Sequence, residues 1–140
     1  MIEALKKSLS YDFIMTNENG LDTAVAQGGS NFSGGQKQRL SIARAIYKQP
    51  SIYIFDDSFS ALDFKTDKNL RTALKKITKE STVFIVAQRI STVLNADQII
   101  VLDEGKIVGI GKHEELMKNC EIYKEIALSQ VTEEELNHGK

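Results

Sequence analysis

The sequence predicts an α/β fold in which a parallel sheet is flanked by helices. Ile52 to Phe55 and Thr82 to Ala87 are near-continuous runs of apolar and β-branched residues, which is the pattern of strands buried on both faces of a parallel sheet. Lys65 to Ile77, which lies between them, has a helical pattern. The three segments therefore predict a βαβ unit, the building block of this fold class.

The residues before the first strand predict two helices and a long loop. Apolar residues recur at three- and four-residue spacing from Ile2 to Phe13, which predicts a short amphipathic helix. TNENGLDTAVAQGGSN, residues 16–31, is rich in Asn and Gly and predicts a long loop, a type of segment that is usually functional. Ser33 to Tyr47 is the next predicted helix, because Ser33-Gly34-Gly35-Gln36 fits a capping box and Pro50 follows the helix end.

The residues after the second strand predict a hairpin and two helices. Gln98 to Leu102 is expected to be a third strand, and DEGK to form a tight turn into a fourth strand, KIVGIG. Lys112 to Lys118 and Ile122 to Leu128 have helical patterns. The polar residues 131–140 are expected to fray.

Composition excludes several classes of function. The 140 residues are 41% hydrophobic and 26% charged, which is enough for one domain with a core. A formal net charge of -1, from 18 basic and 19 acidic residues, gives no basic excess, so no nucleic-acid partner is expected. The single cysteine, Cys120, cannot form an internal disulfide, and His113 and His138 lack the spacing of metal ligands. No apolar run is long enough to cross a bilayer, so any membrane link is expected to be indirect.

Two adjacent carboxylates, Asp56 and Asp57, directly follow the first strand. The carboxyl ends of parallel strands are where open α/β sheets bind ligands. At that place one carboxylate could hold the Mg²⁺ of a nucleotide, and the second could orient an attacking water or accept its proton. The structural alternative is that the pair caps the next helix or hydrogen-bonds the turn.

The start of the helix at Ser33 has the chemistry of a phosphate site. Gly34 and Gly35 have no side chains that would block an oxyanion, and the first turn of a helix offers free N–H groups and a partial positive charge. Ser33 adds a hydroxyl group. The alternative is again structural, namely an ordinary capped helix.

Four motifs in sequence order resemble the nucleotide-binding domain of ATP-binding cassette (ABC) transporters, most closely the exporter type. NFSGGQKQR (Asn31 to Arg39) is similar to the signature motif, IYIFDD to the Walker B strand and VAQRISTV to the switch region. The D-loop is matched by Ser60, Ala61, Leu62 and Asp63. TAVAQGG, residues 23–29, is similar to the exporter segment that touches the coupling helices of the membrane domain.

The resemblance implies a fold, cofactors, partners and residue roles. The fold would be a partial P-loop NTPase (RecA-like) parallel sheet flanked by helices, with part of the ABC helical subdomain at the N-terminus. In the full-length protein, ATP and Mg²⁺ would bind, with Asp56 holding Mg²⁺ through water and Asp57 and Gln88 in the catalytic positions. Ser33, Gly34, Gly35 and Gln36 would address the γ-phosphate held by a second nucleotide-binding subunit. The partners would be that subunit and transmembrane domains, at the cytoplasmic face of the cell membrane.

This sequence departs from the family pattern at two catalytic positions. Asp57 stands where members that hydrolyse ATP carry glutamate, and Gln88 replaces the switch histidine. A displacement of about 1 Å in a reacting group can lower a rate on the order of 10²-fold. Such paired losses resemble the degenerate subunit of a heterodimeric multidrug exporter, whose intact signature serves the partner's site while its own site is slow. Gln27 also replaces a glutamate that is usual in the coupling segment.

The sequence contains no G-x-x-x-x-G-K-[ST] motif, glutamine loop or adenine-stacking aromatic ahead of the signature. The chain is therefore expected to be the C-terminal part of a nucleotide-binding domain. Residues 1–48 would form the helical subdomain and signature helix, residues 49–130 part of the RecA-like core, and residues 131–140 a frayed tail. The chain alone is expected to lack ATPase activity, and its uncovered strands favour a homo-oligomer.

Three alternative functions remain open from the residues. A phospho-acceptor receiver domain also places acidic residues at strand ends, but Asp103 is the only candidate acceptor and the SGGQ segment stays unexplained. A soluble cassette ATPase of the DNA-repair or translation kind shares SGGQ but not the exporter-like segments. A non-catalytic interaction module that retains the dimer and coupling surfaces is the third alternative.

Overall fold

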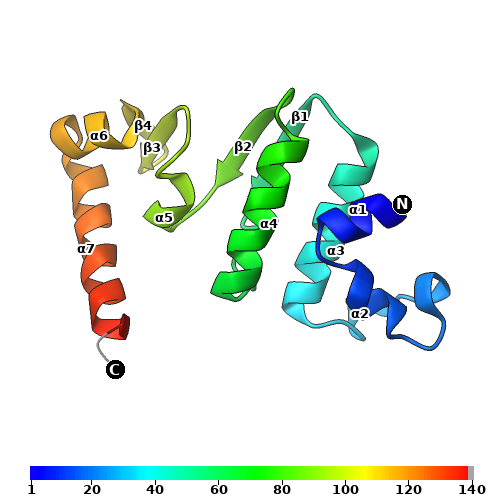
Figure 1. Cartoon of the computed structure of the whole chain (residues 1–140). Helices are drawn as coiled ribbons and strands as arrows, with labels where there is room; N and C mark the ends of the chain where they lie inside the picture. Colours follow the sequence, from blue (N-terminus) through cyan, green and yellow to red (C-terminus); the bar gives the residue numbers. More distant parts are fainter. Residues whose placement is uncertain (139–140) are drawn as a thin grey trace. The chain divides into compact units, whose positions relative to one another are not determined.

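The computed structural model describes the backbone of residues 1–138 and the side chains of residues 1–130. The chain divides into two compact units, one covering Met1–Val86 and one beginning at Ala87 (Figure 1). The elements of the first unit are α1 (Ile2–Lys7), α2 (Tyr11–Met15), η1 (Gly20–Asp22), η2 (Gln27–Gly29), α3 (Gly34–Lys48), β1 (Ile52–Asp56), α4 (Phe64–Ile77) and β2 (Thr82–Val86). Those of the second are α5 (Ile90–Val93), β3 (Ile99–Asp103), β4 (Lys106–Gly111), α6 (His113–Asn119) and α7 (Glu121–His138).

The predicted βαβ unit is confirmed. Strands β1 and β2 pair in parallel, with Ile54 opposite Phe84, and α4 connects them. The core of this unit lies on one face of β1, where Tyr53 and Phe55 pack with apolar residues of α1, α3, α4 and the loop after β1. These residues are Ala4, Ile42, Ile46, Phe59, Leu62, Leu70 and Leu74.

The predicted burial of both faces of these strands is wrong for this chain. Burial alternates along β1, so that Ile54 is 71% exposed while its neighbours Tyr53 and Phe55 are buried. Every residue of β2 is exposed, and Phe84 is 52% exposed. The strand order explains this exposure: within the described residues β1 and β2 form a two-stranded sheet, and β3 pairs with β4 instead of β2. The apolar sequences of β1 and β2 therefore indicate that a further layer should cover these strands, and the described residues do not provide it.

The predicted helix over Ile2–Phe13 is broken into α1 and α2. Leu9, between them, has a left-handed backbone with φ of 58°, which a continuous α-helix cannot contain. The flanking serines are fully buried, and the Ser8 hydroxyl donates to the Ser10 oxygen at 2.9 Å. Apolar spacing gave no sign of this break because it persists across the turn.

The second unit contains the predicted hairpin and a further helix. Strands β3 and β4 pair antiparallel around a tight turn in which Glu104 and Gly105 have φ of 46° and 75°, as a type I′ turn requires. Its core consists of Ile99, Val101, Leu116, Cys120 and Tyr123. The short helix α5 was not predicted, and α7 extends beyond Leu128 to His138. Of the tail expected to fray, Gly139 and Lys140 lie outside the described residues.

None of the helices in the described part of the chain is both long and apolar enough to cross a membrane.

Candidate functional site

The N-terminus of α3 has the predicted capping geometry. The Ser33 hydroxyl accepts from the Gln36 backbone N–H at 3.3 Å, and the Gln36 side chain accepts from the Ser33 N–H at 2.8 Å. The side chains of Ser33 and Gln36 are thus both used to cap the start of the helix, and Ser33 and Gly34 are exposed. The amides of Gly34 and Gly35 belong to the first turn, so the helix itself supplies no acceptor for them. This end of α3 can therefore donate hydrogen bonds to an anion.

The two glycines at this helix end have different surroundings. A Cβ atom on Gly35 would lie 2.9 Å from the carbonyl oxygen of Ala61, which is too close for an ordinary contact. A Cβ atom on Gly34 would lie 3.4 Å from the Ala61 Cβ, which is an ordinary van der Waals distance. Gly35 is thus required by the close approach of the loop after β1, a reason that the sequence did not reveal.

Asp56 and Asp57 lie where the sequence predicted, at the end of β1. Asp56 is the last residue of the strand, and Asp57 begins the following turn with a left-handed backbone at φ of 47°. Both side chains are exposed, and the Asp57 carboxylate accepts from the Ser60 hydroxyl at 3.0 Å. Adjacent carboxylate oxygens suit a hard divalent cation such as Mg²⁺. The turn-bonding alternative also has support, because Asp57 does hydrogen-bond the turn.

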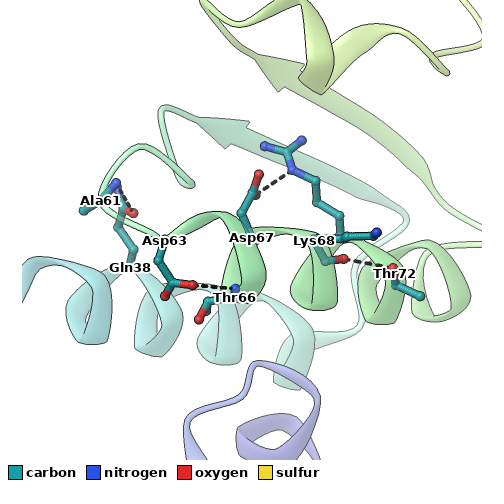
Figure 2. Close-up of polar contacts among 8 residues, drawn as sticks. Gln38, Ala61, Asp63, Thr66, Asp67, Lys68 and Thr72 are labelled. Atoms are coloured by element: carbon teal, nitrogen blue, oxygen red, sulfur yellow. Dashed lines mark hydrogen bonds and ion pairs between the residues drawn. The ribbon is translucent and has the colours of Figure 1, made fainter. Parts of the chain in front are cut away.

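The four D-loop residues have separate structural roles. Ser60 bonds Asp57, Ala61 faces α3, and Leu62 is buried in the core. Asp63 is the N-cap of α4 and accepts from the Thr66 backbone N–H at 2.9 Å, as drawn in Figure 2. The hydrogen bonds of Thr66, first that of its side chain and then that of its backbone N–H, hold the pKa of Asp63 below its ordinary value.

Gln38 joins the signature helix to the loop after β1, and sequence reasoning missed it. Its side-chain nitrogen donates to the Asp57 carbonyl and to the Ser60 hydroxyl, both at 3.0 Å. Its side-chain oxygen accepts from the Ala61 N–H at 3.0 Å, a contact drawn in Figure 2. Its position two residues after Gln36 carries no distinctive pattern, because glutamines are common in exposed helical positions.

Gln88 lies in the second unit, so the structure does not bring it into one described unit with Asp57. It is exposed and directly precedes the N-cap of α5. Its carbonyl accepts from the side-chain nitrogen of Gln130 in α7 at 2.7 Å. The side-chain oxygen of Gln130 accepts from the Ile90 N–H at 2.7 Å. Gln130, like Gln38, was not identified from the sequence.

The TAVAQGG segment is tied to the residues around the signature. The Asn31 side chain accepts from the Ala26 N–H at 3.1 Å and donates to the Ala24 carbonyl at 2.9 Å. The ammonium group of Lys37, in α3, donates to the Gly28 carbonyl at 3.3 Å. Beside this segment lies an apolar pocket of about 180 Å³. Its lining includes Leu5, Ile14, Leu21, Thr23, Val25, Phe32 and Leu40.

Among the residues whose side chains are described, no cluster of three or more His, Cys, Asp or Glu residues could hold a metal. Asp56 therefore stays a candidate Mg²⁺ contact that would need oxygen atoms from the nucleotide and from water, as Mg²⁺ commonly does at phosphate sites.

Comparison with known proteins gives consistent results. Residues 7–60 match the ABC transporter family. An uncharacterized ABC transporter ATP-binding protein of Mycobacterium tuberculosis is 52% identical over 130 residues, which cover 93% of this chain and 22% of that protein. An ATP-dependent lipid A-core flippase of Francisella tularensis is 43% identical over 123 residues, covering 88% of this chain and 20% of the flippase.

A solved structure of a bacterial Atm1-family ABC exporter with ATP bound matches with a TM-score of 0.89 and 35% identity, over 93% of this chain and 23% of that one. The chain thus spans about a fifth of the length of the curated relatives it matches, 22% and 20% in the two cases above. The chain is thus similar, in sequence and in fold, to part of exporter-type ABC transporters.

Proposed function

We propose that this chain is the C-terminal part of the nucleotide-binding domain of an ABC exporter and couples ATP binding and hydrolysis to transport. Residues 1–48 would be the helical part and residues 49–130 the core part of this domain. The carrying observation is the exposed start of α3, where the capping box leaves the Gly34 and Gly35 amides free to donate. In this proposal Ser33, Gly34, Gly35 and Gln36 bind the γ-phosphate of the nucleotide held by a second nucleotide-binding subunit.

The chain's own site would be slow. Asp56 would hold Mg²⁺ through water, and Asp57 would orient the attacking water with a side chain one methylene shorter than glutamate. The Asp57 carboxylate is already engaged by the Ser60 hydroxyl at 3.0 Å, which further limits its reach. Gln88 can donate a hydrogen bond to a phosphate oxygen but cannot carry a positive charge. General-base assistance is typically worth about 10²- to 10⁴-fold, so the weakened pair supports a degenerate subunit of a heterodimer.

Coupling to the transmembrane domains would run through the TAVAQGG segment. Val25 is 69% exposed beside the apolar pocket, so an apolar partner could cover both. Lys37 connects Gly28 of this segment to the signature helix. A force applied to the segment would therefore act on the helix whose N-terminus is proposed to bind phosphate.

The test is restoration of the catalytic pair in the full-length transporter. Asp57→Glu combined with Gln88→His should raise ATP turnover at this chain's own site by about 10²- to 10⁴-fold, the range of general-base catalysis. The measurement is single-site hydrolysis with the partner's site silenced. Glutamate must adopt the left-handed backbone of residue 57, which costs on the order of 1 kcal/mol or more, so the folded fraction is checked in parallel.

Two results would distinguish the proposed catalytic role from a non-catalytic interaction module. The chain alone should show no Mg²⁺-dependent ATPase activity, because its sequence has no phosphate loop to hold the β- and γ-phosphates. Saturable turnover by the chain alone that Asp56→Ala abolishes would contradict this. If the restored pair gives no gain while transport continues, the chain acts as a non-catalytic interaction module.

A further inference from the structure

We propose that Gln38 and Gln130 are positioning residues that fix the backbone of the two loops carrying Asp57 and Gln88. The inference rests on the function proposed above, because it assigns these loops to ATP hydrolysis. Each glutamine comes from a helix distant in sequence and grips its loop with both ends of its side-chain amide. The two arrangements lie in different units of the chain.

The hydrogen-bond partners of Gln38 determine the orientation of its side-chain amide. The Asp57 carbonyl can only accept a hydrogen bond and the Ala61 N–H can only donate, so the amide nitrogen must face Asp57 and the oxygen must face Ala61. The second N–H of the amide reaches the Ser60 hydroxyl at 3.0 Å. Ser60 in turn donates to the Asp57 carboxylate at 3.0 Å. Gln38 therefore acts on both the backbone and, through Ser60, the side chain of Asp57.

The turn at Asp57 needs such support. Its φ of 47° is unfavourable for a residue other than glycine. A conformation of this kind persists only where surrounding contacts hold it. Gln38 supplies three hydrogen bonds to the segment from Asp57 to Ala61, which is enough to offset that cost.

The side-chain amide of Gln130 likewise uses both its nitrogen and its oxygen to bind the backbone of one loop. The Gln88 carbonyl accepts from its side-chain nitrogen and the Ile90 N–H donates to its side-chain oxygen, each at 2.7 Å. Ile90 is the first residue of α5, whose N-cap Arg89 makes no side-chain cap, so Gln130 takes over the capping of that helix. One amide thus fixes the residue at the switch position and the start of the helix that follows it.

Glutamine suits this task because it offers a donor and an acceptor on one rigid plane. Methionine has a similar length but no donor and only a weakly accepting thioether, and glutamate keeps the acceptor while losing the donors. Replacement by glutamate also places a charged oxygen against the carbonyl that the amide nitrogen held. The proposal therefore predicts different consequences for the two substitutions at the same site.

The test uses the full-length transporter and compares Gln38→Met, Gln38→Glu, Gln130→Met and Gln130→Glu with the native protein. Gln98→Met is the matched control, because Gln98 is exposed and no hydrogen bond of its side chain occurs in the described structure. Amide hydrogen exchange is followed in peptides covering residues 57–62 and 88–93. Single-turnover ATP hydrolysis at this chain's own site is measured as a function of ATP concentration.

The methionine variants should exchange at least about tenfold faster, each only in its own loop, which corresponds to losing a hydrogen bond of about 1.4 kcal/mol. The glutamate variants should keep protection of Ala61 or Ile90. All four should hydrolyse bound ATP about 10- to 100-fold more slowly, with the half-saturating ATP concentration changed less than twofold. A purely structural role would shift stability without this separation of rate from affinity.

Asp56→Ala separates failure of this inference from failure of the proposed function. If Asp56→Ala slows hydrolysis while all glutamine variants match Gln98→Met, the loops do not need these glutamines and only the positioning role is wrong. If neither Asp56→Ala nor any glutamine variant slows hydrolysis, the proposed function is wrong and the positioning role with it. Unchanged exchange in both loops, or a raised half-saturating concentration at unchanged rate, would also overturn the positioning role.

Discussion

Substitution of alanine at Gly34 and at Gly35 should have opposite effects on stability, although the residues are neighbours in one helical turn. Neither glycine has a left-handed backbone, so alanine fits the backbone at both. The difference lies in the loop after β1. A Cβ atom on Gly35 would meet the Ala61 carbonyl oxygen at 2.9 Å, whereas one on Gly34 would meet the Ala61 Cβ at 3.4 Å.

The magnitude follows from two opposing terms. Replacing a helical glycine by alanine is favourable by roughly 0.5–1 kcal/mol, because the unfolded chain loses freedom. At Gly34 this term acts almost alone, so Gly34→Ala should be neutral or stabilising. At Gly35 the clash with a backbone atom, which cannot rotate away, costs about 1–3 kcal/mol. Because the gain from alanine is the same at both sites, Gly35→Ala should be less stable than Gly34→Ala by the clash alone, about 1–3 kcal/mol.

Urea unfolding of the chain, followed by circular dichroism, measures this difference. With a denaturant slope of about 2 kcal/mol per molar, the Gly35→Ala midpoint should lie roughly 0.5–1.5 M below that of Gly34→Ala at equal slope. Equal midpoints, or a lower midpoint for Gly34→Ala, would refute the close packing of the Asp57–Ala61 segment against α3. Both variants add a methyl group near the proposed phosphate contacts, so Gly34→Ala also tests phosphate binding in a protein that is not destabilised.

Three further predictions follow from the same structure. The hydrogen bonds from Thr66 lower the pKa of Asp63, so the Asp63 carboxylate stabilises the fold above its unfolded pKa, and this contribution disappears as pH falls through its folded pKa. Asp63→Asn should therefore reduce the fall of the urea midpoint at acid pH, and an unchanged pH dependence would contradict the capping role. The chain should self-associate through the exposed apolar face of β1 and β2, and light scattering should show Ile54→Lys with Phe84→Lys reducing this association; a monodisperse native monomer at high concentration would show that the face needs no cover. In the intact transporter Ser33→Ala should lower turnover at the partner's site while Asp57→Asn changes total turnover little, and the reverse result in site-resolved hydrolysis would exchange the proposed roles of the two subunits.

Elements that arise from local interactions could be predicted from the sequence. The capping box at Ser33 and the turn at Glu104 and Gly105 arise from residues within a few positions of one another, and the structure contains both. The strands and the helix of the βαβ unit are each visible as a residue pattern of their own, and the structure contains that unit too. The family resemblance likewise depends on short motifs whose spacing is visible in the chain. Residue pattern alone therefore located Asp56, Asp57 and the signature residues at a strand end and a helix start.

The contacts that hold these elements together, and the surfaces that stay exposed, depend on residues far apart in the chain. Gln38 reaches Asp57 across 19 positions and Gln130 reaches Gln88 across 42, so no local pattern could reveal either contact. The requirement for glycine at position 35 depends on a carbonyl oxygen at Ala61, and the break at Leu9 lies between two serines that the fold buries completely, Ser8 and Ser10. The apolar sequences of β1 and β2 also predicted burial wrongly. Hydrophobic side chains favour a covering layer, but whether they are buried depends on whether residues elsewhere in the protein provide that layer.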